Sequence, residues 1–345
     1  MRSFLKPAAG FTCLFALATA GCSSGSDGET DAAPKPSARE TSAAPTPAST
    51  TASATSYAPY VSATEASDND SAGSPTTYNL AFVIADGSAC TPAWNGEDSL
   101  ADSSVKSRIS QLKADGGSVR VSFGGASGKE LASTCDSATA LAAAYGKALD
   151  AAGSTQADFD IEGDQLTDAD SVALRSQAIA LLQKERSDLS VTFTLPVMPS
   201  GLDSDSLALL ASANKYDVQV STVNLMTMNY GESYSGDMGD YALTSAKAAH
   251  TQLKKVFGLS DEGAWQGMAL TSMIGVNDVD GETFTLSDAA QVRAFAEEKE
   301  IAWVSMWSTF RDQQCEEGSD GDDDAATNCS GVTQSSGAFG KAFAG

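Results

Sequence analysis

Residues 157–163 read Ala-Asp-Phe-Asp-Ile-Glu-Gly, and three carboxylates, Asp158, Asp160 and Glu162, occupy alternate positions in this stretch. Because alternate side chains of a β-strand point to the same face, the pattern predicts a row of acids spaced about 6.6 Å apart. Like charges held this close raise the pKa of at least one carboxyl. A protonated carboxyl beside an ionised one is suited to glycoside hydrolysis; the alternative interpretation is the polar face of an exposed edge strand.

The acidic row belongs to one of eight short β-like segments that alternate with helical stretches. The β-like segments are residues 57–63, 78–84, 118–123, 157–162, 189–195, 223–228, 268–273 and 301–307. Amphipathic helices are predicted, for example, over residues 136–152, 167–185 and 287–299, the last with Ser287 as N-cap and Asp288 in its first turn. Residues 57–345 are therefore predicted to form one α/β domain, a (β/α)8 TIM barrel. A doubly wound open sheet is disfavoured because no Gly-rich phosphate loop follows the first strand.

Catalytic groups of such barrels lie at the C-terminal ends of the strands. Polar, aromatic and glycine residues of this chain follow those ends, namely Gly124, Gly125, Glu162, Asn229, Tyr230, Asn277, Asp278 and Trp307. This placement favours a site at the mouth of the barrel over an exposed edge strand.

The chain contains a single histidine, His250, in a helical stretch over residues 243–257, where it is expected at the surface or at the boundary of the core. One histidine argues against a Ser-His-Asp triad, a Cys-His pair and a multi-histidine metal site. Acid–base chemistry therefore falls to carboxylates, and we expect neither a metal nor another cofactor. The net charge of −24, without a basic patch, disfavours nucleic acid as a partner.

The N-terminus has the features of an export signal. A short basic region precedes an apolar stretch over residues 11–20, which is too short to span a bilayer. Thr-Ala-Gly-Cys at residues 19–22 resembles a bacterial lipobox, although Thr19 stands where a larger aliphatic residue is usual. We therefore expect residues 1–21 to be removed and Cys22 to carry a lipid anchor on the outer face of the cell membrane. The alternative is ordinary cleavage within this stretch and free secretion.

Residues 22–56 consist mainly of Ser, Thr, Ala, Pro and Gly, with scattered charges. Almost none of these side chains can be buried, so the segment is predicted to be a disordered tether. No later segment is long and apolar enough to span a membrane, so membrane contact is expected only through the lipid anchor.

Four further cysteines, Cys90, Cys135, Cys315 and Cys329, follow the expected tether. An even number in an exported protein predicts two disulfides. Cys315 and Cys329 would close an acidic loop, and the pairing of Cys90 with Cys135 then follows by elimination.

Four motifs in order resemble the family 18 glycoside hydrolases, the chitinase family. Residues 122–125 (Ser-Phe-Gly-Gly) match the family's S-x-G-G, and residues 158–162 match the later part of D-x-x-D-x-D-x-E. Residues 226–231 (Met-Thr-Met-Asn-Tyr-Gly) are similar to M-T-M-D-Y-G, and residues 307–312 (Trp-Ser-Thr-Phe-Arg-Asp) are similar to W-S-x-N-R-D. The resemblance implies a retaining chitinase that cleaves β-1,4-linked N-acetylglucosamine chains.

The resemblance also implies a role for each residue of the row. Glu162 would protonate the glycosidic oxygen, and the substrate's own acetamido oxygen would attack the sugar carbon in place of a second carboxylate. Asp160 would orient the acetamido group, and Asp158 would share a proton with Asp160. Tyr230 would donate its hydroxyl to the acetamido oxygen, and Trp307 would form an apolar floor under the sugar. Further substrate contacts are expected from Met226, Met228, Asn229, Gly124, Gly125 and Asn277.

Three positions depart from the family pattern. Thr155 replaces the first Asp of the acidic motif, Asn229 replaces the Asp of M-T-M-D-Y-G, and Phe310 replaces a polar Asn. The neutral Asn229 removes a negative charge near Glu162, so we expect a lower Glu162 pKa and a shifted pH profile.

The segment 275–286 is too short for the α+β insertion that walls the cleft of some chitinases. We therefore expect an open groove, internal cleavage of chains, and a monomer acting on chitin or chito-oligosaccharides. Two alternatives remain open at this point: an endo-β-N-acetylglucosaminidase acting on N-glycans, and an inert barrel that binds chito-oligosaccharides.

Overall fold

The computed structural model describes residues 55–114, 116–316 and 328–345. The expected signal peptide, Cys22 and nearly all of the expected tether lie outside the described residues. The folded domain begins slightly before the expected boundary at residue 57. Ser56 already belongs to a strand, and Thr55 Oγ1 donates a hydrogen bond to the carbonyl of Ala296 (3.0 Å).

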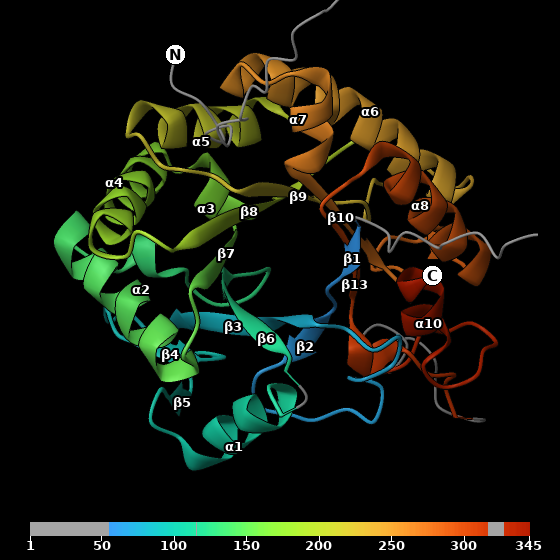
Figure 1. Ribbon diagram of the computed structural model, residues 1–345, viewed down its shortest axis with the longest axis horizontal. Coiled ribbons are helices and arrows are strands. Elements are labelled where there is room, and N and C mark those ends of the chain that lie inside the picture. The colour runs from blue at the N-terminus through green and yellow to red at the C-terminus, as the bar shows by residue number, and fades with distance from the viewer. Residues whose placement is uncertain (1–54, 115, 317–327) are drawn as a thin grey trace, which may run out of the picture. The chain divides into compact units, whose positions relative to one another are not determined.

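Parallel strands form a closed barrel. In sheet order they are β1 (Ser56–Tyr57), β13 (Trp303–Trp307), β10 (Met268–Met273), β9 (Thr222–Met226), β8 (Ser190–Pro196), β7 (Gln156–Asp160), β6 (Ser118–Gly124), β3 (Thr77–Ala85) and β2 (Tyr60–Ser62). All neighbouring pairs in this order are parallel. The predicted (β/α)8 barrel is confirmed, and Figure 1 shows its strands surrounded by helices.

The barrel closes through the first predicted strand, which is split into two parts by Pro59. Before the proline, Ala58 N donates to Val304 O of β13 (2.9 Å); at the proline, Pro59 O accepts from Asn79 N of β3 (2.9 Å). Because proline has no amide hydrogen, it cannot continue the ladder with β13. The chain therefore changes partner here, so that β1 pairs with β13 and β2 pairs with β3.

Helices cover the outside of the barrel (Figure 1). They are α1 (Ser103–Leu112), α2 (Ala138–Ala152), α3 (Asp164–Thr167), α4 (Ala169–Glu185), α5 (Ser204–Lys215), α6 (Met238–Phe257), α7 (Asp261–Gln266), α8 (Leu286–Lys299) and α10 (Ala338–Ala344), with short 3-10 helices η1 (Leu131–Ser133) and η2 (Thr309–Arg311). The connection from β2 to β3, residues 63–76, consists of turns and bends without a helix.

The expected N-cap of α8 is wrong by two residues. The cap is Thr285, whose hydroxyl accepts from Asp288 N while the Asp288 carboxylate accepts from Thr285 N (2.7 Å). This reciprocal capping box satisfies two otherwise unpaired amides, which a cap at Ser287 would not do.

Two small β-elements extend the barrel. β4 (Pro92–Trp94) and β5 (Asp98–Ser99) add antiparallel strands beside β3. β11 (Gly275–Val276) and β12 (Thr283–Phe284) form a hairpin after β10. This hairpin takes up the connection before α8, so the expected absence of a chitinase-type insertion domain in this connection is confirmed.

Both predicted disulfides are confirmed. Cys90 is bonded to Cys135 and joins the loop after β3 to the loop after η1. Cys315 is bonded to Cys329 and brackets the segment 317–327, which lies outside the described residues.

The main core lies between the strands and the helices. Phe123, Phe159 and Phe193 are in register on β6, β7 and β8, and Tyr145 of α2 packs edge-on against the first two rings. Each buried phenyl ring contributes about 1.5–3 kcal/mol to folding. Because Phe159 faces this outer layer, the carboxylates on either side of it in sequence face the barrel interior, as the alternation predicts.

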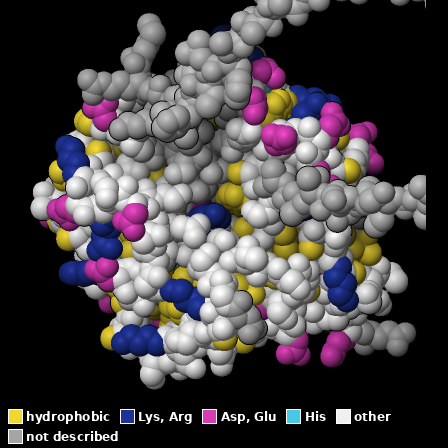
Figure 2. Space-filling model, viewed as in Figure 1, with side chains coloured by type: hydrophobic (Ala, Val, Ile, Leu, Met, Phe, Trp, Pro, Cys, Tyr) yellow, Lys and Arg dark blue, Asp and Glu magenta, His cyan; other side chains and the backbone are white. Residues whose placement is uncertain are grey.

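His250 is more buried than expected, with 7% of its surface exposed, because its ring stacks on Trp265 of α7 (3.9 Å between centres). On the face drawn in Figure 2, acidic and basic side chains are interspersed around the periphery. None of the helices in the described part of the chain has the length and apolarity needed to cross a bilayer.

Candidate active site

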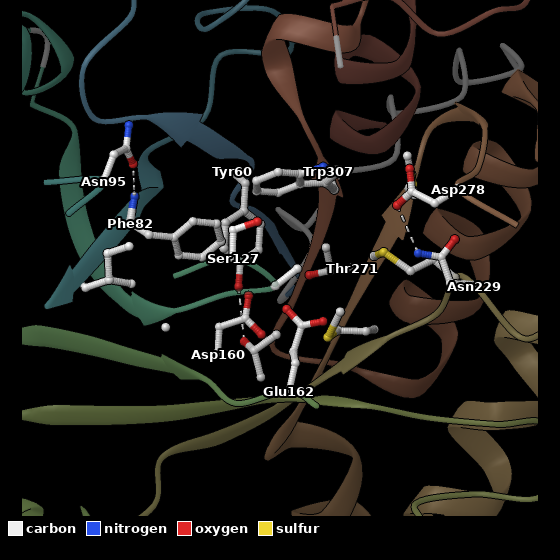
Figure 3. A pocket seen from close by; sticks show the side chains of 17 residues that line it. Tyr60, Phe82, Asn95, Ser127, Asp160, Glu162, Asn229, Thr271, Asp278 and Trp307 are labelled. Carbon is white, nitrogen blue, oxygen red and sulfur yellow. Dashed lines mark hydrogen bonds between the residues drawn. The ribbon is translucent and has the colours of Figure 1, made fainter. Parts of the chain in front are cut away.

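Glu162 lies just beyond the end of its strand. β7 ends at Asp160, so the expected strand through Glu162 is two residues too long. The extended path continues only until Ile161 N donates to Thr194 O of β8 (3.1 Å), and the chain turns at Gly163, whose φ is 51°. Glycine adopts this left-handed conformation without a steric penalty. The turn leaves the Glu162 side chain beside that of Asp160 (Figure 3).

A cavity of about 460 Å³ opens at the C-terminal ends of the strands. Its lining includes seven of the residues expected from sequence, namely Gly124, Asp160, Glu162, Met226, Met228, Asn229 and Trp307. The remaining lining residues are Tyr60, Phe82, Ile84, Asn95, Ala126, Ser127, Thr194, Thr271, Met273 and Asp278. The acids thus share one cavity with aromatic and methionine side chains.

Asp158 lies behind the cavity wall and is fully buried. Its carboxylate accepts hydrogen bonds from the hydroxyls of Ser122 (2.6 Å), Thr194 (2.7 Å) and Tyr60 (2.8 Å). Burial raises its pKa, whereas the three hydroxyls and the charge of Arg120 act in the opposite direction. Three donors on one carboxylate stabilise its ionised form, so we assign the negative charge to Asp158.

The carboxyls of Asp160 and Glu162 lie side by side (Figure 3), and each affects the pKa of the other. Burial, together with the nearby charges of Glu162 and Asp158, raises the pKa of Asp160 well above its usual range. Burial also raises the pKa of Glu162 to about 7, although the hydrogen bond from Asp160 partly lowers it. A carboxyl with this pKa is protonated in slightly acidic solution and can act as a general acid.

Asp278 supplies a negative charge next to Asn229. Asn229 is the residue that stands in place of the Asp of the family motif. Asn229 Nδ2 donates to Asp278 Oδ2 (3.3 Å), as Figure 3 shows. The Asp278 charge contributes to raising the pKa of Glu162. A carboxylate from a different loop thus supplies negative charge near Glu162, and the lower Glu162 pKa expected relative to a chain with Asp at position 229 stays a prediction.

Gly124 and Gly125 allow close approach of backbones. A Cβ on Gly124 would lie 2.1 Å from the carbonyl oxygen of Asp160, and a Cβ on Gly125 would lie 2.9 Å from the Phe82 ring. Gly125 N also donates to Asp160 O (2.9 Å). Gly124 lines the cavity and Gly125 does not, so the pair serves mainly to hold β6 against β7.

Trp307 is part of an aromatic group at the cavity wall. Its ring stacks on Phe82 (5.5 Å between centres) and makes edge contacts with Tyr60 (5.8 Å) and Phe310 (5.7 Å). Phe310, the departure from the family's polar residue, thus packs against the side of the tryptophan.

Besides Gly125, two expected substrate contacts, Tyr230 and Asn277, do not line the cavity. The Tyr230 ring packs against Tyr234 and Tyr241, it is only 4% exposed, and burial raises its pKa. Asn277 is 7% exposed, and its side-chain Nδ2 donates hydrogen bonds to the carbonyls of Met273 and Gly275. Tyr230 lies away from the cavity because Asn229 before it has a positive φ of 54°, which interrupts the alternation of side chains that a strand would give. Tyr230 therefore points toward α6.

Tyr60, Phe82 and Asp278 are among the ten lining residues to which the sequence assigned no role. Asp278 was identified with Asn277 as a strand-end residue, but its contact with Asn229 gives it a role that its position in the sequence did not indicate. Within the described ranges, no group of three or more His, Cys, Asp and Glu side chains is arranged to hold a metal ion.

Two curated relatives match most of the barrel. A probable bifunctional chitinase/lysozyme of Escherichia coli is 34% identical over 275 residues, which cover 74% of this chain and 31% of the relative. Endochitinase 11 of Metarhizium anisopliae is 32% identical over 276 residues, covering 74% of this chain and 52% of the relative. The chain thus spans only a third to a half of these relatives. No family model matches the chain.

Solved structures give a fuller correspondence. The catalytic domain of a hyperthermophilic chitinase from Pyrococcus furiosus is 30% identical, with a TM-score of 0.73, and the match covers 83% of this chain and 93% of that domain. A GH18 chitinase from Pseudoalteromonas aurantia shares the fold at 14% identity, with a TM-score of 0.54 over 74% of this chain and 94% of the other. On this evidence, together with the acidic row at the mouth of the barrel, the chain belongs to the family 18 chitinases.

Proposed function

We propose that this chain is a retaining chitinase that hydrolyses β-1,4-linked N-acetylglucosamine chains with the substrate's acetamido group as nucleophile. The observation that carries the proposal is the placement of the neighbouring Asp160 and Glu162 carboxyls in one cavity with Trp307, where the Glu162 pKa is raised to about 7. A related catalytic-site mutant of the Pyrococcus furiosus chitinase has been solved with chito-oligosaccharides.

The proposed first step uses Glu162 as general acid. Glu162 gives its proton to the glycosidic oxygen as the bond to the sugar carbon breaks. The acetamido oxygen of the same sugar forms a bond to that carbon from the opposite face, and an oxazolinium intermediate results. Asp160 hydrogen-bonds the acetamido N–H and stabilises the positive charge that develops on this group.

In the second step, Glu162 is a carboxylate and acts as general base. It removes a proton from water, the water oxygen attacks the sugar carbon, and the acetamido oxygen leaves. Two inversions give net retention. The apolar rings of Trp307 and Phe82 offer a surface for the flat face of a sugar.

The test is hydrolysis of an N-acetylglucosamine pentamer, followed by proton NMR of the fresh products. We expect the β-anomer to appear first. Release of glycan from a high-mannose glycoprotein without cleavage of the pentamer would instead indicate an endo-β-N-acetylglucosaminidase, and binding without turnover from pH 4 to 8 would indicate an inert barrel.

The pH profile should depend on Asp278. Because the negative Asp278 raises the Glu162 pKa, its replacement by Asn should lower that pKa. Glu162 must be protonated to act as an acid, so activity is lost as pH rises through its pKa. We therefore expect Asp278→Asn to move the alkaline limb of kcat/KM, near pH 7 in the parent, to lower pH. Asp280→Asn, which changes an exposed residue of the same loop outside the cavity lining, is the matched control, and an unshifted limb in Asp278→Asn would contradict the prediction.

We further propose that Cys22 carries a lipid anchor and that residues 22–54 tether the barrel to the outer face of the membrane. The proposal is supported by the apolar stretch 11–20, the small residues before Cys22 and the Ser-rich composition that follows. Mass spectrometry of the mature N-terminus should find a diacylglyceryl group on Cys22, and Cys22→Ala should move the protein from membranes to the medium. An unmodified N-terminus at Gly21 would indicate ordinary secretion.

A further inference from the structure

A buried cation lies inside the barrel below the acidic row. Arg120 is two residues before Ser122 on β6, so its side chain points to the same face, and it is 7% exposed. Its Nη1 donates to Asn79 Oδ1 of β3 (2.5 Å), and its Nη2 donates to Gln156 Oε1 of β7 (3.2 Å). The guanidinium carbon lies 4.6 Å from the ring centre of Trp303 on β13.

All of these contacts are with neutral groups. In the described part of the chain, no Asp or Glu oxygen lies within ion-pair distance of Arg120, and its Nε has no hydrogen-bond partner. Burying a charge without a direct partner is unfavourable. An apolar side chain would fill this position at a lower desolvation cost. We therefore expect the charge of Arg120 to have a role other than stabilising the fold.

The carboxylate one layer above Arg120 is Asp158. Ser122 is in register with Asp158, which places Arg120 beside Gln156, two residues before Asp158 on β7. The groups that face Asp158 are the hydroxyls of Tyr60 and Thr194 from β2 and β8, that of Ser122 from β6, and the carboxyl of Asp160 on its own strand. Arg120 is the cation that acts on Asp158 electrostatically.

Hydrogen bonds from a neighbouring strand orient the Thr194 hydroxyl toward Asp158. Thr194 Oγ1 accepts from Asn224 Nδ2 (2.9 Å) and donates to Asp158, while Asn224 Oδ1 accepts from Thr271 (2.9 Å). This series of hydrogen bonds directs the hydroxyl hydrogen of Thr194 toward Asp158, as expected for an ionised carboxylate. A positive charge below Asp158 reinforces the same state.

We propose that Arg120 is a positioning residue whose charge keeps Asp158 ionised, so that the proton of the Asp158–Asp160 pair remains on Asp160, hydrogen-bonded to Glu162. The inference rests on the proposed function. It adds a residue, Arg120, that does not line the cavity and acts only through Asp158.

The test compares Arg120→Met, which removes the charge, with Arg120→Lys, which keeps it. Loss of a nearby positive charge raises the pKa of every carboxyl in the row. We expect both limbs of the kcat/KM profile of Arg120→Met to move to higher pH by about 1 unit. The Arg120→Lys profile should stay within a few tenths of a unit of the parent. If the profile of Arg120→Met superimposes on that of the parent while only its melting temperature falls, Arg120 is merely structural and the proposal is wrong.

A second variant covers the case in which Arg120→Met does not fold. Asn79→Asp places a carboxylate against Nη1 of Arg120 and offsets its charge without removing its side chain. Its limbs should also move to higher pH, and an unmoved or lowered profile would overturn the proposal.

A readout without substrate separates this proposal from the proposed function. Carbon-13 NMR of Asp carboxyl carbons identifies Asp158 as the resonance absent from Asp158→Asn. In the parent this resonance should be that of an ionised carboxylate at neutral pH, and its titration should move upward in Asn79→Asp. If Asp158 behaves in this way but the parent does not cleave the pentamer, the role of Arg120 is supported and the proposed chitinase activity is refuted. If the parent is active but its Asp158 is protonated at neutral pH, the proposed activity is supported and the role of Arg120 is refuted.

Discussion

Replacement of Glu162 by Gln is expected to lower kcat on chito-oligosaccharides by about 10²–10⁴-fold, the contribution of a positioned general acid. Gln has nearly the same shape as protonated Glu, but its amide does not transfer a proton at neutral pH. Binding should change little, because the residue remains able to hydrogen-bond Asp160. The measurement is steady-state hydrolysis of a chromogenic oligomer, with affinity followed through the fluorescence of tryptophan.

Asp164→Asn is the matched control for this experiment. Asp164 is an exposed carboxylate two residues after Glu162, at the start of α3, and it does not line the cavity. Its replacement removes one negative charge from the same short segment and should leave kcat within a factor of two or so of the parent. Retention of more than a tenth of the activity by Glu162→Gln would show that another group donates the proton.

The alternation of acids and apolar residues predicted which side chains face the interior, because the two faces of a strand depend only on local sequence. Local sequence could not predict that the first strand is split into β1 and β2. The split depends on β13, which pairs with Ser56–Tyr57 from the far end of the chain, and the Ser56 hydroxyl donates to the Ala302 carbonyl, 246 residues away. The end of β7 was also missed, because the turn at Gly163 is a backbone event that hydrophobic periodicity does not report.

The site was predicted well where residues lie on strands and less well where they lie on loops. Asn229 adopts a left-handed conformation, which turns Tyr230 toward α6, so the residue order alone gave the wrong direction. Asp278 reaches Asn229 across 49 positions of sequence, and a pattern within one segment cannot reveal such a pairing. The roles of Asp158 and Asp160 differ for the same reason, since the hydroxyls that bind Asp158 come from other strands.

Replacement of Asp160 by Ala and by Asn should separate its two contributions. Both variants lose the carboxyl that faces the substrate's acetamido group, so kcat should fall by about 10²–10³-fold, as for other groups that stabilise charge in the transition state. The hydrogen bond from Asp160 lowers the pKa of Glu162. Asp160→Ala removes this donor, so the Glu162 pKa should rise above about 7, and the alkaline limb of the residual activity should move to higher pH.

Asp160→Asn keeps an N–H donor next to Glu162 and should show a smaller rise than Asp160→Ala. The comparison therefore distinguishes the carboxyl that faces the acetamido group, which both variants lose, from the hydrogen-bond donor to Glu162, which only the Ala variant loses. A common fall in kcat with a limb that moves only in the Ala variant would assign both roles to Asp160. Equal limbs in the parent and the Ala variant would mean that Asp160 does not set the protonation of Glu162, and the pairing of these two carboxyls would then carry no catalytic meaning.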